Sequence, residues 1–203
     1  DWRKIPTNSM GREQCGSIKS DGTLWTWGDN SGGGLGDGST TNRSSPVQIG
    51  SLTNWKTLTM STHGMLFIKT DSTLWGTGKG NGGRLGDGST VDKSSPVQVG
   101  SLTNWKYVSS GDFHAFAIKT DGTLWAWGQN TSGTLGDGST TNRSSPVQIG
   151  SNTNWAWCGA SGTCGAAINT SGQLFTWGDG QGGRTGHGNE TDYSSPVQVG
   201  SLT

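Results

Sequence analysis

The chain has 203 residues, and 14 lysines and arginines balance 14 aspartates and glutamates, giving a formal net charge of zero. The charged fraction of 14% is well below the roughly 25% of an average soluble domain. A nucleic-acid surface needs a basic stripe that neutralises phosphates, and the sequence has none, so we expect no nucleic-acid partner. We also expect no membrane insertion, because no apolar run approaches 18 residues.

One pattern recurs every 50 residues. The stretch Asp121-Gly-Thr-Leu-Trp-Ala-Trp-Gly-Gln-Asn130 has counterparts that begin at Asp21, Asp71 and Ser171. A fixed period of this length indicates a solenoid, propeller or array, in which each unit buries its apolar surface against its neighbours. We therefore expect a single module over residues 1–203, divided into repeats 1–53, 54–103, 104–153 and 154–203.

Taken in chain order, the third repeat predicts four short antiparallel strands. Alternating or β-prone runs cover residues 105–108, 114–119, 123–128 and 144–149. The last of these contains Pro146, which cannot donate to a sheet ladder, so we expect that strand at the edge of its sheet. The same proline recurs in the other repeats, as Pro46, Pro96 and Pro196.

The turn residues carry their own predictions. Asp121 and Gly122 stand between two alternating runs, as Asp21 and Gly22 do in the first repeat, and this pattern predicts a two-residue type I′ hairpin turn. A second aspartate follows in the glycine-rich loop of three repeats. We expect it to accept hydrogen bonds from amides of its own turn rather than to bind calcium, since one carboxylate per loop cannot fill a calcium shell. These loop residues are Asp37, Asp87 and Asp137.

The aromatic residues are expected to be structural. A strand has a period of two, so Trp125 and Trp127 share one face of their strand, as Trp25 and Trp27 do. Such residues fit an apolar core better than a ligand platform. The full set expected to pack between blades is Trp25, Trp27, Trp75, Trp125, Trp127, Phe175 and Trp177.

These features together describe an all-β propeller of four-stranded blades. The run from Gly111 to Gly128, with the Leu-Gly-Asp-Gly and Ser-Pro-Val motifs that follow it, closely resembles the repeat of the regulator of chromosome condensation family, including its bacterial and viral members. The fourth repeat departs from the family pattern at Phe175, Thr185 and His187. The position at which the family has a histidine is occupied by His114 in the third repeat. In the other repeats it is occupied by Gln14, Gly64 and Cys164. The resemblance implies a propeller that usually closes with seven blades.

No catalytic or metal-binding constellation emerges, and we expect no cofactor. His63 and His114 are one step out of register, which would turn their side chains to opposite faces. We expect both to be packed or hydrogen-bonded, and His187, in its loop, to be solvated. Cys158 and Cys164 are six residues apart around a turn; free thiols are favoured over a bond, although a bond between two strands is the alternative.

The uniform units favour a non-enzymatic structural or protein-interaction module, such as one in a cell-surface protein or a phage or virion appendage. That setting favours an extracellular or virion-surface location over the cytoplasm. Two alternatives follow from the family resemblance. One is a guanine-nucleotide exchange factor for a small GTPase, whose insertions and arms are missing from these regular repeats. The other is an enzyme-inhibiting or ligand-binding propeller, which would need loop variation concentrated on one face.

The number of repeats bears on the partner. Four repeats are about four-sevenths of the family's usual ring, and an open arc would expose apolar faces on both terminal blades. The sequence starts and stops at the same joint of the repeat. We therefore expect the end blades to be covered by further blades of the same polypeptide, by another copy or by a host assembly. A tight ring of four blades is the competing arrangement.

Overall fold

The computed structural model describes residues 1 and 13–200. Over these residues its regular secondary structure is β-strand, apart from three single-turn 3₁₀ segments, and the strands are joined by turns and loops. The elements are β1 (Gln14–Ile18), β2 (Leu24–Gly28), β3 (Arg43–Gln48), β4 (Trp55–Met60), β5 (Gly64–Lys69), β6 (Leu74–Gly78), η1 (Asn81–Gly83), β7 (Lys93–Gln98), β8 (Trp105–Ser110), β9 (His114–Lys119), β10 (Leu124–Gly128), η2 (Thr131–Gly133), β11 (Arg143–Gln148), β12 (Trp155–Ala160), β13 (Cys164–Asn169), β14 (Leu174–Gly178), η3 (Gln181–Gly183) and β15 (Tyr193–Gln198).

Each repeat folds into one antiparallel sheet whose strands follow chain order. The orders are β4-β5-β6-β7, β8-β9-β10-β11 and β12-β13-β14-β15, and the first sheet contains β1-β2-β3. The fourth strand expected for the first repeat would precede Gln14 and lies outside the described residues. The all-β propeller architecture predicted from the repeat is thus confirmed, and we call the four sheets blades 1 to 4.

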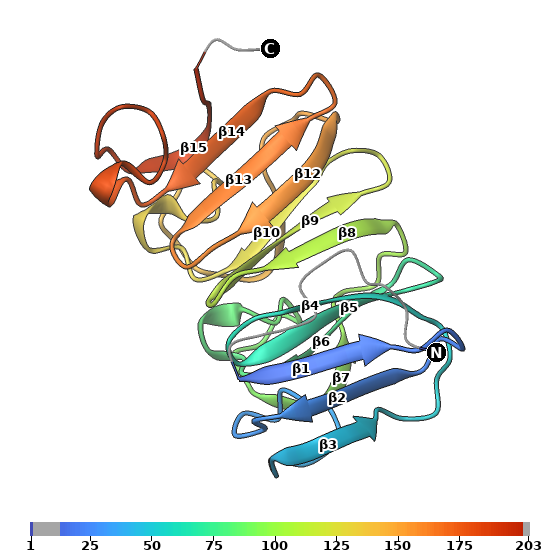
Figure 1. The fold of residues 1–203 in the computed structure, drawn as a ribbon. Helices are drawn as coiled ribbons and strands as arrows, with labels where there is room; N and C mark the ends of the chain where they lie inside the picture. Colours follow the sequence, from blue (N-terminus) through green and yellow to red (C-terminus); the bar gives the residue numbers. More distant parts are fainter. Residues whose placement is uncertain (2–12, 201–203) are drawn as a thin grey trace.

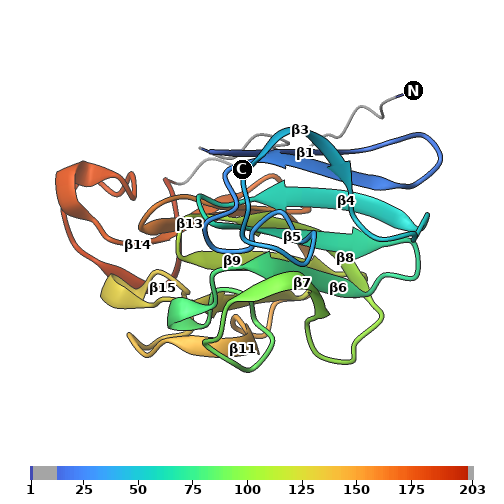
Figure 2. The ribbon, with the colours of Figure 1, turned by 90° about the horizontal axis from the view of Figure 1, so that it is seen from below.

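The blades stack face to face into an open arc, with blade 1 and blade 4 at opposite ends (Figure 1). The first strands of blades 2 to 4 (β4, β8 and β12) meet along the inner edge. There Thr59 and Ser110 share a hydrogen bond of 3.2 Å between hydroxyls, and the Ala160 amide donates to the Ser109 hydroxyl at 3.2 Å. The loops that carry η1, η2 and η3 project from the same side of the stack (Figures 1 and 2). The structure is therefore an arc and not a closed ring of four blades.

The prolines lie where the sequence predicted. Pro46, Pro96, Pro146 and Pro196 all fall on the outer edge strands β3, β7, β11 and β15. In blade 3 the pairing of β10 with β11 jumps from Ala126–Val147 to Gly128–Arg143, so the outer strand bulges around its proline. An edge strand with a bulge tolerates the missing proline donor, which explains why the motif can recur in every blade.

The hairpin turn differs from the predicted type I′ form. Type I′ requires positive φ at both central residues, whereas in this turn only Gly122 has positive φ, at 78°. The Gly122 amide donates to Lys119 O at 3.0 Å and the Lys119 amide to Thr123 O at 3.1 Å, which makes a three-residue loop that ends in a glycine bulge. Asp121 instead accepts from the Thr123 amide at 3.0 Å and from its hydroxyl at 2.6 Å. Asp21 and Gly22 form the same arrangement.

Three apolar cores lie between successive blades, and each draws on both of its neighbours. The core between blades 1 and 2 combines Ile18, Leu24 and Ile49 with Trp55 and Phe67. The face of a blade that packs on the blade after it is here called its leading face. Equivalent clusters join blade 2 to blade 3 and blade 3 to blade 4. Because every core needs two blades, stacking is the source of the buried apolar area.

The tryptophans predicted to pack between blades fall into two groups. Trp127 and Trp177 are fully buried in the inter-blade cores. Trp125 is half-buried, with its ring 6.1 Å from Trp105 of the same blade and the Lys119 ammonium 3.4 Å from its centre. Trp75 lies in the same way against Trp55, and Phe175 against Trp155. Trp25 and Trp27 are both half-buried, and Lys19 lies 3.9 Å above Trp25.

This difference predicts unequal costs for two neighbouring substitutions. Trp127→Ala should reduce the free energy of unfolding by about 3–5 kcal/mol, since it leaves a cavity between blades 2 and 3. Trp125→Ala should cost clearly less, because Trp125 is only partly buried and its ring contacts Trp105 and Lys119 of its own blade. Urea unfolding of both variants measures the difference. A larger loss for Trp125→Ala would mean that the inter-blade cores do not dominate stability.

Candidate functional site

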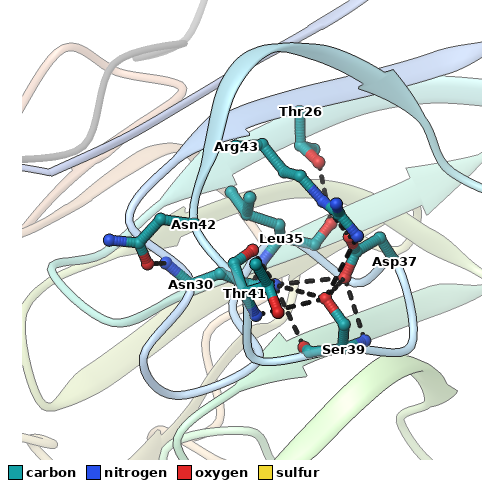
Figure 3. Close-up of polar contacts among 8 residues, drawn as sticks. All are labelled: Thr26, Asn30, Leu35, Asp37, Ser39, Thr41, Asn42 and Arg43. Atoms are coloured by element: carbon teal, nitrogen blue, oxygen red, sulfur yellow. Dashed lines mark hydrogen bonds and ion pairs between the residues drawn. The ribbon is translucent and has the colours of Figure 1, made fainter.

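A buried asparagine organises the glycine-rich loop of blade 1 (Figure 3). Asn30 has no exposed surface; its side-chain oxygen accepts from the Leu35 amide at 2.9 Å, and its amide nitrogen donates to Asp37 at 3.1 Å. Asp37 in turn accepts from the Ser39 amide at 2.9 Å and forms an ion pair of 2.6 Å with Arg43. A fully satisfied buried polar network of this kind holds a loop in one conformation.

The charge state of the loop aspartate follows from these contacts. Burial alone would raise the pKa of Asp37, but hydrogen bonds from Ser39, Arg43 and Asn30 together outweigh it and hold the pKa below its usual value. Asp137 has the same partners in blade 3, with Arg143 at 2.7 Å, and its pKa is lowered in the same way. In blade 2, Gly80 replaces the asparagine and Lys93 pairs with Asp87 at 3.4 Å. The predicted acceptance of turn amides is present at all three aspartates.

Each of these loops is hydrogen-bonded to the next blade. The Gly38 amide donates to Ser94 O at 2.7 Å, the Gly88 amide to Ser144 O at 2.8 Å and the Gly138 amide to Ser194 O at 2.7 Å. From the other side, the indole N–H of Trp127 donates to Arg84 O at 3.0 Å and that of Trp177 to Thr134 O at 2.9 Å. We call residues 31–38, 81–88, 131–138 and 181–188 the clasp loops of blades 1 to 4.

Glycine is required at the contact between clasp loop and tryptophan. Gly136 has a φ of 77°, and a Cβ added there would lie 2.8 Å from the indole nitrogen of Trp177. Gly86 is in the same position against Trp127, with a φ of 79° and a distance of 2.7 Å. Any side chain would be strained by the backbone and would push the two blades apart. The recurrent Leu-Gly-Asp-Gly motif is thus an inter-blade contact.

The clasp loop of blade 4 grips nothing in the described structure. Among residues 1 and 13–200, no atom lies within 4 Å of a Cβ placed at Gly183 or Gly188, and at Gly186 the neighbour is Val199 of the same blade, at 3.7 Å. The leading face beside it is also open. Leu174 is 37% exposed, whereas Leu24, Leu74 and Leu124 at the same position in blades 1 to 3 are 0% exposed.

An aromatic pair replaces the ion pair in this last clasp loop. His187 stands where the other loops have aspartate, and its ring lies 4.7 Å from that of Tyr193, which stands where they have arginine or lysine. His187 Nε2 is also 3.0 Å from the Thr176 hydroxyl, and Asn189 donates to the Tyr193 hydroxyl at 3.1 Å. The prediction that His187 is simply solvated is therefore wrong. The contact between the His187 and Tyr193 rings thus takes the place of the ion pair of the other clasp loops.

A hollow of about 890 Å³ lies over this open face and extends to the inner edge of the arc, where Thr59 of blade 2 and Ser109 of blade 3 also line it. Trp157, Tyr107 and Arg184 line it together with Cys164 and the backbone of β12 and β13. Trp157 is 42% exposed, and Arg184 bonds to Thr163 and Asp179 of its own blade. In contrast, Arg84 at the same position in blade 2 donates to Asp112 O of the next blade at 3.0 Å. Arg184 thus lines the hollow at a position where the equivalent arginine of blade 2 contacts the following blade.

The remaining reactive residues do not gather into a site. His114 is 2% exposed with its ring against Phe116, while His63 is half-buried just before β5. Within residues 1 and 13–200 no three histidine, cysteine or acidic side chains are grouped so as to hold a metal. Cys15, Cys158 and Cys164 are all free thiols, as favoured from the sequence. Among the described residues, no helix has the length and apolar character needed to cross a membrane.

The fold and the clasp loops define an arc of β-propeller blades. The regulator of chromosome condensation (RCC1) repeat matches residues 21–65, 71–118, 121–168 and 171–203, and a second description of the same repeat matches residues 105–134. The chain belongs to this family, as the sequence resemblance indicated. No curated protein sequence matches it significantly.

Solved structures agree on the fold. Human WBSCR16 is 21% identical with a TM-score of 0.81 over 94% of this chain. Yeast RCC1 (Prp20), crystallised with Kap60, is 18% identical with a TM-score of 0.82 over 98% of this chain. A second structure of Prp20p from Saccharomyces cerevisiae is 19% identical with a TM-score of 0.81, again over 98%. The match covers only 52%, 51% and 53% of those proteins, so this chain spans about half their length.

Burial of His114 predicts a pH dependence of stability. Burial lowers the pKa of His114 from 6.5 to about 4, so between these values the unfolded chain binds a proton that the native state does not. Stability should be full above pH 6.5 and fall by up to roughly 3 kcal/mol as the pH drops to about 4. Urea unfolding across this range measures the decline.

The variant His114→Gln provides the control, because Gln14 already occupies the same buried position in blade 1. This variant should lose most of the decline. It should keep the part due to His63, whose pKa burial also lowers, and, near pH 4, the part due to carboxylates with lowered pKa values such as Asp37 and Asp137. An unchanged pH profile in His114→Gln would show that His114 keeps its ordinary pKa in the native state, so that burial does not lower it.

Proposed function

We propose that this chain is a non-enzymatic protein-interaction module whose fourth blade holds a further β-blade of the same repeat type. One observation carries the proposal: an open apolar leading face and a clasp loop without a neighbour occur together on blade 4. Blades 1 to 3 each place the same two features against the blade that follows. Because blades 1 to 3 use this face and this loop to bind the following blade, the same features on blade 4 support binding of a further blade there.

The energetics favour covering this face. Leu174 and Trp157 are 37% and 42% exposed, and burial of a large apolar side chain contributes about 1.5–3 kcal/mol. An apolar patch with a polar rim is a usual mark of a protein-interaction site. The chain's zero net charge and low charged fraction also fit a protein partner better than a phosphate-rich one. The uniform units support a structural role, for which a cell or virion surface is the setting that we propose.

The exchange-factor alternative has no residue-level support in this chain. Kap60, Gsp1p and histones are named in connection with the yeast proteins. Those proteins share 18% and 19% sequence identity with this chain, and identity at that level supports a common fold but not a common partner. The clasp loops keep the same length in all four repeats, so no insertion is available for a partner of that kind. Binding through the open blade face needs none.

Adding a fifth repeat tests the proposal. A second copy of residues 104–153, fused after Thr203 so that the 50-residue period continues, should dock on blade 4 and bury Cys164. His114, at the equivalent position in blade 3, is only 2% exposed, next to the backbone of Cys164 in blade 4. In a Cys15→Ser background, thiol labelling of Cys164 should therefore slow by at least about tenfold, because docking would remove it from solvent.

The matched control is the same fusion with Trp105→Ser and Trp127→Ser in the appended copy alone, which cannot build the inter-blade core. Its Cys164 should label at the rate of the unfused chain. Equal rates in the intact and the control fusion would contradict the proposal, since the open face would then not accept a blade. Dilute protein keeps contacts between different molecules out of the measurement.

A further inference from the structure

The open joint of blade 4 has a complement at the other end of the same chain. At the three occupied joints, the clasp loop lies on the outer strand of the next blade, where Gly33, Gly83 and Gly133 sit against the Cα atoms of Ser94, Ser144 and Ser194. The same strand supplies the carbonyl that accepts the last glycine amide of the loop. At these joints each clasp loop thus packs on a Ser-Ser-Pro strand of the next blade.

Blade 1 carries such a strand without a clasp loop upon it. In β3, Ser44 and Pro46 are both exposed. The equivalent residues of β7, β11 and β15 are half-buried, since the preceding clasp loop covers them. The β3 strand of blade 1 is thus uncovered. It has the same sequence, Ser-Ser-Pro-Val-Gln, as the three strands that clasp loops cover.

We propose that a second copy of this chain docks head-to-tail, with its β3 strand of blade 1 under the free clasp loop of blade 4. The inference rests on the proposed function and names the partner. One chain bears both halves of a contact that it already makes three times within itself. The two halves lie at opposite ends of the arc, so these four blades do not bring them together within one copy (Figure 1).

The geometry of such a contact follows from the internal joints. Gly183 has a φ of 71°, close to the 73° and 78° of Gly133 and Gly83, so its loop backbone is already shaped to lie on a serine Cα. The interface is heterologous, and it gives a closed assembly if the rotation per blade allows and a longer chain of copies if it does not. Two copies contain eight blades, which is within the range of known propellers.

Complementary variants test the proposal in solution. Leu174→Glu places a charge on the open leading face, and Ser44→Phe places a bulky ring where the incoming clasp glycine must rest. Leu174→Glu disrupts the binding surface of blade 4 and leaves blade 1 intact, and Ser44→Phe does the reverse. Val91→Glu is the matched control, because Val91 is 62% exposed on a loop of blade 2, away from both ends. Thermal unfolding should first show that all three variants are folded.

Sedimentation velocity at matched concentrations gives the result. Wild type and Val91→Glu should sediment as dimers or longer assemblies, and Leu174→Glu and Ser44→Phe should each sediment as monomers. In a 1:1 mixture of these two variants, the intact blade 4 of Ser44→Phe should bind the intact blade 1 of Leu174→Glu and give a heterodimer. The restored dimer separates head-to-tail docking from contact between two blade 4 faces, because in the latter case Ser44→Phe would still associate.

Monomeric wild type, association of Ser44→Phe alone, or a mixture that stays monomeric would each overturn the proposal. These outcomes are distinguishable from failure of the proposed function. If the intact five-repeat fusion protects Cys164 while the wild-type chain stays monomeric, blade 4 accepts a blade but not one from a second copy. If neither experiment shows docking, both proposals fall.

Discussion

The contact between each clasp loop and the next blade is the constraint on which the rest of the structure depends. Every apolar core lies between two blades, so no blade can bury its residues alone. The loop backbone approaches the next blade closely enough for Trp127 and Trp177 to donate to its carbonyls. That approach requires glycine at Gly86 and Gly136, where a Cβ would collide with the indole ring.

This constraint also explains what varies between repeats and what does not. The network around Asp37 and Arg43 can be replaced by His187 and Tyr193, because either pair keeps the loop closed. The clasp glycines are retained in the fourth repeat even though its loop touches no following blade. A loop that keeps this conformation beside an open apolar face is the physical basis for proposing a further blade as the partner of blade 4.

Much of the fold could be predicted from the sequence, because the period of 50 and the edge prolines are local signals. The hairpin turn was predicted wrongly, since Asp-Gly suits both a type I′ turn and a three-residue loop with a glycine bulge, and the pairing of Lys119 with Thr123 decides between them. The indole contacts of the clasp loops join residues 43 positions apart across a blade boundary, as in Arg84 and Trp127, and no periodicity reveals them. The paired departure at His187 and Tyr193 was a usable signal, because two positions that carry an ion pair elsewhere change in one repeat.

The most direct test of the clasp is a pair of glycine substitutions with the same backbone strain. Gly136 and Gly186 both have a φ of 77°, but a Cβ would lie 2.8 Å from Trp177 at Gly136 and 3.7 Å from Val199 at Gly186. Urea unfolding should therefore show that Gly136→Ala costs about 1–3 kcal/mol more than Gly186→Ala, the usual cost of overpacking. Equal costs would contradict the account, since they would mean that the loop glycines serve only their own turns and that the contact between loop and next blade does not hold the arc together.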